Sequence, residues 1–175
     1  MTSLFIGDSI TDGFPFSELL PGKDIVNMGI SGASSRDILD RFNAEWVQDN
    51  PSRVFICLGT NDLARDVDDD SITGNLSSLV SHTREYLQPG APRIYLTSLF
   101  PTLSNPSRPN DRIDRLNNRI HQLALSHGEP YLHLNVFFKD DENRLLSGFT
   151  DDGLHLNREG YRLWAGLIEI GRAHV

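Results

Sequence analysis

Near the start of the chain stands the stretch Ser3-Leu4-Phe5-Ile6-Gly7-Asp8-Ser9-Ile10-Thr11, in which a short apolar run leads into a glycine, a carboxylate and a serine. The arrangement occurs twice more. Asp24–Met28 leads into Gly29-Ile30-Ser31-Gly32, and Arg53–Leu58 leads into Gly59-Thr60-Asn61-Asp62. Compact apolar runs of this kind are typical of strands that are covered on both faces of a parallel sheet. We therefore predict an α/β fold in which each polar segment follows a strand.

The rest of the chain continues this alternation of short apolar runs and amphipathic stretches. The predicted strands are Ser3–Ile6, Asp24–Met28, Arg53–Leu58, Arg93–Ser98 and Pro130–Leu134. The clearest helical patterns cover Ser71–Leu87 and Asp111–His127, with Gly128 as a C-cap, and a last helix begins near Asn157. Such alternation predicts a parallel sheet with helices on both faces. Two irregular stretches, 101–110 and 138–151, are expected to be loops, and long loops in compact domains often bind ligands.

Length and charge narrow the class of protein. The 175 residues fit one domain, 1–175. With 16 basic and 24 acidic side chains the net charge is −8, which argues against a nucleic-acid partner or an anionic membrane surface. No apolar run approaches the length of a membrane span, so no membrane insertion is expected. The one cysteine, Cys57, lies inside an apolar run and requires no oxidising compartment. We expect a cytoplasmic protein, or a secreted one only if a signal peptide has been removed.

The polar segments are expected to form one site. Ligands of open α/β sheets bind beyond the carboxyl ends of the strands. The three segments that begin at Gly7, Gly29 and Gly59 therefore share one edge of the sheet. A fourth segment, Asp152-Gly153-Leu154-His155, lies between the fifth strand and the last helix, on a connection that can return to that edge.

This set contains the groups that acyl transfer to a serine requires. Ser9 is the candidate nucleophile, and a serine hydroxyl needs a base within hydrogen-bond reach to attack an ester. His155 can supply that base, and Asp152, three residues earlier, can hold the imidazole in the required tautomer. Taken singly, Ser9 could equally be a helix N-cap.

Candidate donors for an oxyanion stand in the same segments. Gly32 has no side chain, so its amide can approach a substrate closely. Asn61 carries an NH₂ donor on a short side chain, and the Ser9 amide near the start of a helix could be a third donor. Simple turn geometry for Gly32 and an Asx-turn for Asn61 are the alternatives, and both can hold alongside the functional roles.

Some nearby residues have competing interpretations. Gly29-Ile30-Ser31-Gly32-Ala33 nearly spells the Gly-x-Ser-x-Gly nucleophile motif, but the final glycine is missing, which argues against Ser31. Asp151 is the rival of Asp152, one residue further from His155. Asp8 is expected to bind backbone amides of neighbouring loops, and Asp62 and Asp151 have similar structural interpretations.

The four segments together resemble the GDSL esterase family, also called SGNH hydrolases, after a Ser, Gly, Asn and His in separate blocks. Gly7-Asp8-Ser9-Ile10 resembles the first block, with Ile10 where the family name has Leu. The later blocks are matched by Gly32, Asn61 and the Asp152–His155 segment, in order and across most of the chain.

This resemblance implies a flavodoxin-like three-layer α/β/α sandwich around a five-stranded parallel sheet. It also implies a Ser9–His155–Asp152 triad, an oxyanion hole of Ser9, Gly32 and Asn61, and no metal or cofactor. The expected activity is hydrolysis of small-acyl esters, either carbohydrate acetyl esters or other short-chain esters, through an acyl-enzyme. The alternatives are a lysophospholipase or thioesterase of the same fold, and a catalytically inactive carbohydrate- or lipid-binding module.

Overall fold

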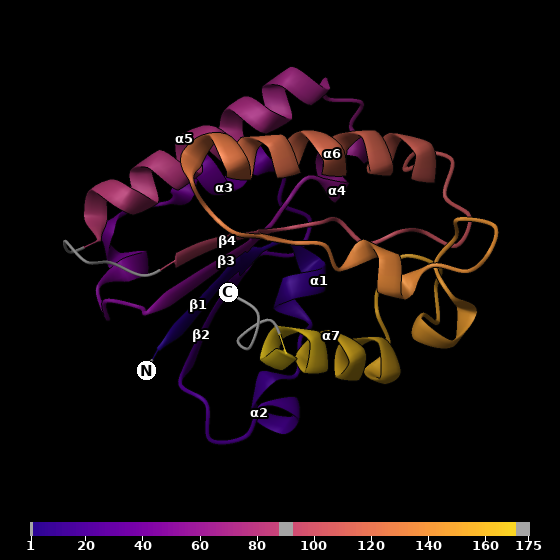
Figure 1. Ribbon diagram of the computed structural model, residues 1–175, viewed down its shortest axis with the longest axis horizontal. Coiled ribbons are helices and arrows are strands. Elements are labelled where there is room, and N and C mark those ends of the chain that lie inside the picture. Colours follow the sequence, from indigo (N-terminus) through magenta and orange to yellow (C-terminus); the bar gives the residue numbers. More distant parts are fainter. Residues whose placement is uncertain (1, 88–92, 171–175) are drawn as a thin grey trace.

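The computed structural model describes residues 2–87 and 93–170, which contain a five-stranded parallel sheet (Figure 1). The strands are β1 (Ser3–Gly7), β2 (Ile25–Gly29), β3 (Arg53–Cys57), β4 (Arg93–Thr97) and β5 (Tyr131–Leu132). Their order across the sheet is β2-β1-β3-β4-β5. The predicted α/β fold is confirmed. The prediction of a strand over Pro130–Leu134 was too long, because only Tyr131 and Leu132 pair with β4 at the edge of the sheet.

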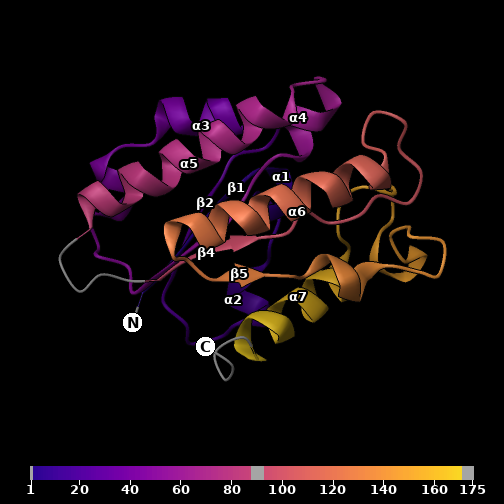
Figure 2. The ribbon, with the colours of Figure 1, turned by 45° about the horizontal axis from the view of Figure 1, so that its top comes forward.

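Helices cover both faces of this sheet. They are α1 (Ser9–Asp12), α2 (Phe16–Leu19), α3 (Ser35–Arg41), α4 (Thr60–Ala64), α5 (Asp69–Tyr86), α6 (Asn110–His127) and α7 (Arg158–Ile170), with 3₁₀ turns η1 (Ala44–Val47), η2 (Asn135–Phe138) and η3 (Ser147–Phe149). Figures 1 and 2 show α3, α4, α5 and α6 over one face and α1, α2 and α7 over the other. The sheet is therefore the middle of three layers. No helix in the described ranges is long and apolar enough to cross a membrane.

The strand order explains this division of the helices. From β1 the chain moves outward to β2, and it then crosses back over β1 to β3 and continues to β4 and β5. Parallel crossovers are right-handed, so connections that progress in opposite directions across a sheet lie on opposite faces. The short helices α1 and α2 of the first connection are thus separated from α3, α5 and α6, which belong to the later ones.

Three strands end at the same level, and one short helix packs directly against them. Gly7 at the end of β1 is paired with Gly29 of β2 and with Cys57 of β3. A Cβ atom on Gly7 would lie 2.0 Å from Oγ1 of Thr11, and one on Gly29 would lie 2.2 Å from the amide nitrogen of Asp12. Both glycines are therefore needed for α1 to sit against the strand ends.

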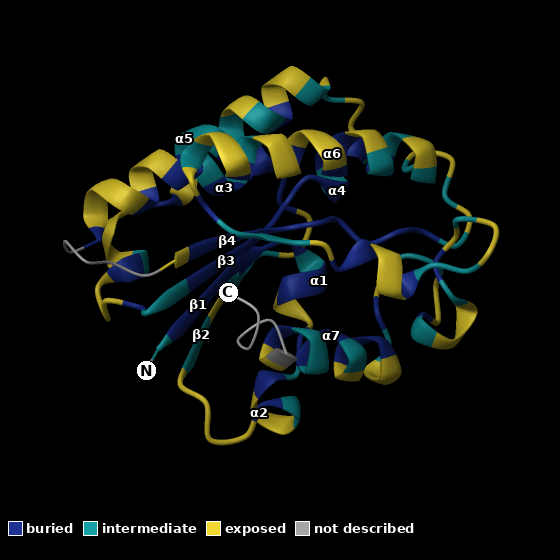
Figure 3. Cartoon of the chain, viewed as in Figure 1, coloured by how far each residue is buried: buried dark blue, intermediate teal, exposed yellow. Residues whose placement is uncertain are grey.

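The core fixes α7, and with it the segment that precedes α7. The central strands are buried (Figure 3), and Trp164 of α7 is 1% exposed. Its indole ring packs edge-on against Phe14 and Phe100. The Tyr161 hydroxyl donates a 2.7 Å hydrogen bond to the carbonyl oxygen of Ile10 in α1. These contacts bring the chain immediately before α7 to the side of α1.

The ends of the two long helices follow their local sequence. The Asp68 carboxylate caps α5 by accepting a hydrogen bond from the Ser71 amide at 2.8 Å, so this helix begins at Asp69, two residues before the predicted start. The end of α6 at His127 and the C-cap at Gly128 are confirmed, with a left-handed φ of 68° at the glycine.

Candidate active site

Ser9 stands at the first position of α1, directly after β1. The Asp8 carboxylate caps this helix by accepting a hydrogen bond from the Ile10 amide at 2.9 Å. The cap holds the turn between strand and helix, so the hydroxyl of the half-buried Ser9 has a defined direction. Asp8 was predicted to bind backbone amides of neighbouring loops, and this is wrong in the partner, because the amide belongs to Ile10 in the same turn.

Asp8 is itself buried, at 2% exposure. Removal from water raises its pKa to about 6, although the hydrogen bond from Ile10 and the charge of His155 act in the opposite direction. The carboxyl group next to the candidate nucleophile therefore holds its proton to a higher pH than an exposed aspartate would.

A chain of hydrogen bonds joins Ser9 to the segment before α7. Its Oγ lies 3.0 Å from Nε2 of His155, and Nδ1 of His155 lies 2.6 Å from Oδ2 of Asp152. The other carboxylate oxygen, Oδ1, accepts from the amides of His155 at 2.8 Å and of Leu154 at 2.9 Å. Three residues that the sequence prediction grouped, 146 positions apart at the extremes, are thus in direct contact.

The turn around His155 is closed by Thr150. Its hydroxyl donates to the carbonyl oxygen of His155 at 2.7 Å and accepts from the amide of Gly153 at 2.9 Å. This turn aims the imidazole at Ser9. Partial burial would raise the pKa of Asp152, but the hydrogen bonds from the His155 ring and from the Leu154 and His155 amides outweigh it and hold this pKa well below its usual range.

The two rival residues lie elsewhere in the network. Asp151 accepts a 3.4 Å hydrogen bond from Nδ2 of Asn157 rather than contacting the imidazole. The Ser31 hydroxyl donates to the carboxylate of Asp12 at 2.7 Å. The geometry therefore favours Asp152 over Asp151 and Ser9 over Ser31 as partners of His155.

The candidate oxyanion donors lie in the segments that follow the adjacent strands β1, β2 and β3. Among the described residues, the amides of Ser9 and Gly32 have no hydrogen-bond partner. Gly32 has a left-handed φ of 79°, a conformation that glycine adopts without strain. The carbonyl oxygen of Gly32 accepts a 2.8 Å hydrogen bond from the Arg65 guanidinium, so the backbone beside this amide is held in place.

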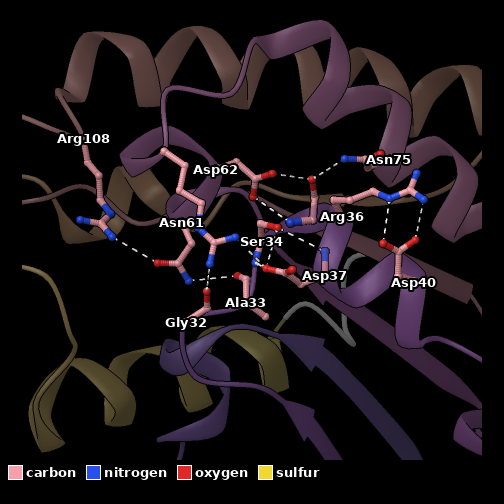
Figure 4. Close-up of polar contacts among 12 residues, drawn as sticks. Gly32, Ala33, Ser34, Arg36, Asp37, Asp40, Asn61, Asp62, Asn75 and Arg108 are labelled. Carbon is pink, nitrogen blue, oxygen red and sulfur yellow. Dashed lines mark hydrogen bonds and ion pairs between the residues drawn. The ribbon is translucent and has the colours of Figure 1, made fainter.

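The carboxamide of Asn61 is oriented by its two neighbours (Figure 4). Its Nδ2 donates to the carbonyl oxygen of Ala33 at 3.0 Å, and its Oδ1 accepts from the guanidinium of Arg108 at 3.2 Å. A carbonyl oxygen can only accept and an arginine can only donate, so these partners determine which end of the amide is nitrogen. One N–H of Nδ2 is used by Ala33, and the second is left for another acceptor.

A buried carboxylate joins the loops that carry Gly32 and Asn61. Asp62, 1% exposed, accepts from the Ser35 amide at 2.8 Å and from the Ser35 hydroxyl at 2.6 Å. Asn75 of α5 donates to the same hydroxyl at 3.0 Å. Figure 4 shows these contacts beside Asn61. The structural interpretation of Asp62 is confirmed: it fixes the start of α3 against α4.

Asp37 and Arg65 form a second set of contacts that holds these loops together. Asp37 accepts from the amide of Ser34, the N-cap of α3, and from Arg65 at 2.8 Å. The hydrogen bonds from Ser34 and Arg65 lower the pKa of Asp37 to about 2. Arg65 therefore links this capped helix start to the Gly32 carbonyl.

Other reactive or ligating side chains lie away from this cluster. Burial raises the pKa of the Cys57 thiol to about 12, which makes it an inert core residue as expected. Within residues 2–87 and 93–170, no three His, Cys, Asp or Glu side chains are grouped so that they could hold a metal ion.

Comparisons with known proteins identify the family and the fold of this chain. Residues 5–163 match the model of the GDSL-like Lipase/Acylhydrolase family. The fold is similar to that of a GDSL-like lipase from Bacteroides thetaiotaomicron, with 28% identity, a TM-score of 0.80, and 97% of this chain and 86% of that chain covered. It is also similar to a lipase/acylhydrolase from Enterococcus faecalis, with 26% identity, a TM-score of 0.80, and 98% and 96% covered.

A curated relative is larger than this chain. The N-acylneuraminate cytidylyltransferase of Escherichia coli is 30% identical over 141 residues, which are 79% of this chain and 32% of that protein. The chain thus spans about a third of the length of this relative.

Proposed function

The chain belongs to the GDSL-like lipase/acylhydrolase family and is a hydrolase of ester bonds, and from this premise we propose that it is a serine esterase for small-acyl esters. The single observation that carries the proposal is the pair of contacts from Ser9 to His155 and from His155 to Asp152, at 3.0 and 2.6 Å. A hydroxyl, an imidazole and a carboxylate in this sequence of contacts form the arrangement that activates a serine nucleophile.

In the proposed reaction, Oγ of Ser9 attacks the carbonyl carbon of the ester while Nε2 of His155 takes the hydroxyl proton. The tetrahedral intermediate then collapses, and the leaving alcohol takes that proton from His155. Water attacks the resulting acyl-Ser9 ester with His155 again as base, which releases the carboxylic acid and restores the hydroxyl. Asp152 holds Nδ1 protonated throughout and stabilises the imidazolium that forms twice in each cycle.

In this proposal, three hydrogen-bond donors stabilise the negative charge of both tetrahedral intermediates. They are the amides of Ser9 and Gly32 and the second N–H of Asn61. Support comes from the absence of other partners for the two amides among the described residues and from the fixed orientation of the Asn61 carboxamide. Donors that are already oriented lower the barrier because nothing has to reorganise as charge develops, and each is typically worth about 10²–10³ in rate.

The exposure of the site favours small acyl groups. The side chains of His155 and Asp152 are 45% and 54% exposed, so water reaches the site from the side of the proposed base. A long acyl chain gains its binding energy by leaving water, at about 0.8 kcal/mol for each buried CH₂ group, and an open site gives it little surface to bury. Acetyl to butyryl esters are therefore the proposed substrates.

A carbohydrate acetyl ester is the first subclass to test. The E. coli relative is named for its action on an N-acylated sugar acid, although this chain spans only about a third of it. A lysophospholipase or thioesterase of the same fold is the second candidate, and a catalytically inactive carbohydrate- or lipid-binding module is the third.

A fluorophosphonate probe and p-nitrophenyl acetate separate a serine hydrolase from an inactive module. We expect the wild-type protein to hydrolyse the acetate ester and to be labelled at Ser9, and we expect Ser9→Ala to lose both properties while it remains folded. An inactive module would give neither turnover nor label. Labelling at Ser31, or an active Ser9→Ala variant, would refute the assignment of Ser9.

A further inference from the structure

Arg108 lies in the loop between β4 and α6 and reaches across to the segment that follows β3. Its Nε donates to the carbonyl oxygen of Thr60 at 2.9 Å. A terminal nitrogen donates to Oδ1 of Asn61 at 3.2 Å, a contact that Figure 4 shows. In the described part of the chain, no carboxylate lies within ion-pair distance of this guanidinium, which is half-buried. A guanidinium that forms no ion pair thus contacts the carboxamide that we assign to the oxyanion hole, and the charge of Asp8 acts on this guanidinium from farther away.

The loop presents Arg108 in a fixed position. The Thr102 hydroxyl donates to the carbonyl oxygen of Arg108 at 3.0 Å, and the Arg108 amide donates to the carbonyl oxygen of Asn105, also at 3.0 Å. Asn110 closes the loop with two 2.8 Å hydrogen bonds to the backbone of Thr102. These contacts hold the backbone of Arg108 at the place from which its guanidinium reaches Asn61.

The contact has two physical consequences for Asn61. First, a donor-only partner on Oδ1 keeps the carboxamide from turning over, a motion that would place its oxygen where the donor N–H should be. Second, the positive charge of the guanidinium beside Oδ1 polarises the carboxamide. Its N–H becomes a stronger donor, because hydrogen bonds in a chain reinforce one another. Both effects matter most when negative charge develops on the substrate.

We propose that Arg108 is a positioning residue for ester hydrolysis, which acts by orienting and polarising the Asn61 carboxamide. The proposal rests on the function proposed above for Asn61. It predicts that Arg108 affects the stabilisation of the intermediate and leaves substrate binding nearly unchanged. We therefore expect Arg108→Met to lower kcat by about 10- to 100-fold, as for loss of a charged hydrogen bond, with little change in KM.

The competing explanation is that Arg108 has a structural role alone, and holds its loop in place through the hydrogen bond to the Thr60 carbonyl oxygen. Because the amide of Leu103 in this loop donates to the carbonyl oxygen of Gly153 at 2.8 Å, a loosened loop would disturb His155 as well. A double-mutant cycle with Asn61→Ala distinguishes the two explanations. If Arg108 acts through Asn61, Arg108→Met should change kcat less than about twofold in the Asn61→Ala background. An equal loss in both backgrounds would overturn the proposal.

Two further variants sharpen the cycle. Arg115→Met removes the same charge from an exposed position of α6 and should leave kcat unchanged. Arg108→Lys keeps the charge but cannot span the Thr60 carbonyl and Asn61 Oδ1 with one planar fork, so it should recover only part of the activity. Full activity of the lysine variant would show that the charge alone matters, and the orienting role would be wrong.

A spectroscopic measurement separates failure of this inference from failure of the proposed function. The side-chain NH₂ signals of Asn61, identified by their loss in Asn61→Ala, should shift in a ¹⁵N–¹H spectrum of Arg108→Met and stay in place in Arg115→Met. If the wild type hydrolyses no ester, the proposed function is wrong, and the NMR shift still decides whether Arg108 holds Asn61. An active wild type with unshifted Asn61 signals in Arg108→Met would refute the inference alone.

Discussion

Replacing Asp152 with asparagine should reverse the tautomer of His155. The Oδ1 atom of Asp152 accepts hydrogen bonds from two backbone amides, so the oxygen of an asparagine has to remain on that side. Its NH₂ group then occupies the position of Oδ2, 2.6 Å from Nδ1 of His155. A donor at that position requires Nδ1 to be an acceptor, and the ring proton moves to Nε2, which faces Ser9. The imidazole could then no longer accept the serine proton.

The size of the effect follows from two contributions. Loss of the carboxylate charge removes about 1–4 kcal/mol of imidazolium stabilisation, for a pair at the ~4 Å of an ion contact in a medium between water and protein surface. The reversed tautomer adds about 1–2 kcal/mol, roughly one hydrogen bond. Together, about 2–6 kcal/mol predicts a fall in kcat of about 30-fold to 2 × 10⁴-fold. The upper end is close to the ~10⁴ known for the same change in a serine protease triad. Initial rates of wild type and Asp152→Asn with p-nitrophenyl acetate at pH 8 measure this fall in kcat.

Asp151→Asn is the matched control for this experiment. It makes the same chemical change one residue away, at a carboxylate whose 3.4 Å contact is with Asn157. We expect its kcat to stay within about twofold of the wild type, as for a surface substitution outside the site. If Asp151→Asn is the impaired variant and Asp152→Asn is active, the assignment of the acid is wrong by one residue.

Three further predictions concern the donor, the substrate and the buried acid. Asn61→Ala should lower kcat by about 10²–10³ with little change in KM, whereas a purely structural Asn61 would lower the thermal midpoint and leave the turnover of folded protein unchanged. Activity on p-nitrophenyl esters should peak between acetate and butyrate, and a maximum at dodecanoate would favour a lysophospholipase. Because burial raises the pKa of Asp8 to about 6, the folded state retains a proton that the unfolded chain loses near pH 4, and the contribution of Asp8 to stability falls as pH rises through this interval. Asp8→Asn keeps an acceptor for the Ile10 amide but cannot ionise. Its free energy of unfolding in urea, relative to that of the wild type, should therefore increase by about 2–3 kcal/mol from pH 4 to pH 7. A difference that stays the same over this pH range would contradict the burial argument.

The sequence identified the parts of the fold that carry a strong pattern. The apolar runs after Ser3, Asp24, Arg53 and Arg93 became strands because each is long enough to be buried between two layers of helices. Short elements were harder to predict. Helix α3 has seven residues, too few for a clear apolar periodicity, and its start is marked by a capping box between Ser34 and Asp37. Strand β5 ends at Leu132 because the amide of Leu134 donates back to the carbonyl oxygen of Leu132 at 3.0 Å, and the chain turns into η2.

The candidate site was predictable to the extent that its residues follow strand ends. Ser9 and Asn61 come directly after β1 and β3, so topology alone places them near each other. Arg108 could not be found in this way, because its partner Asn61 is 47 residues away and the contact depends on the path of an irregular loop. The available signal was weaker: Arg108 belongs to a stretch, 101–110, whose length and composition indicated a binding loop.

The strand order also explains how residues from both ends of the chain can form one site. Since β1 lies between β2 and β3, a serine that follows β1 has the loop carrying Gly32 on one side and the loop carrying Asn61 on the other. The strands β4 and β5 lie farther away, and the chain that follows them reaches the site through long loops. These loops are joined to each other: the Leu103 amide donates to the carbonyl oxygen of Gly153 at 2.8 Å, and the Leu145 amide donates to that of Thr102 at 3.0 Å. The segment that carries Arg108 and the segment that carries His155 therefore support one another, so changes of sequence in either loop should alter turnover through both the base and the oxyanion donors.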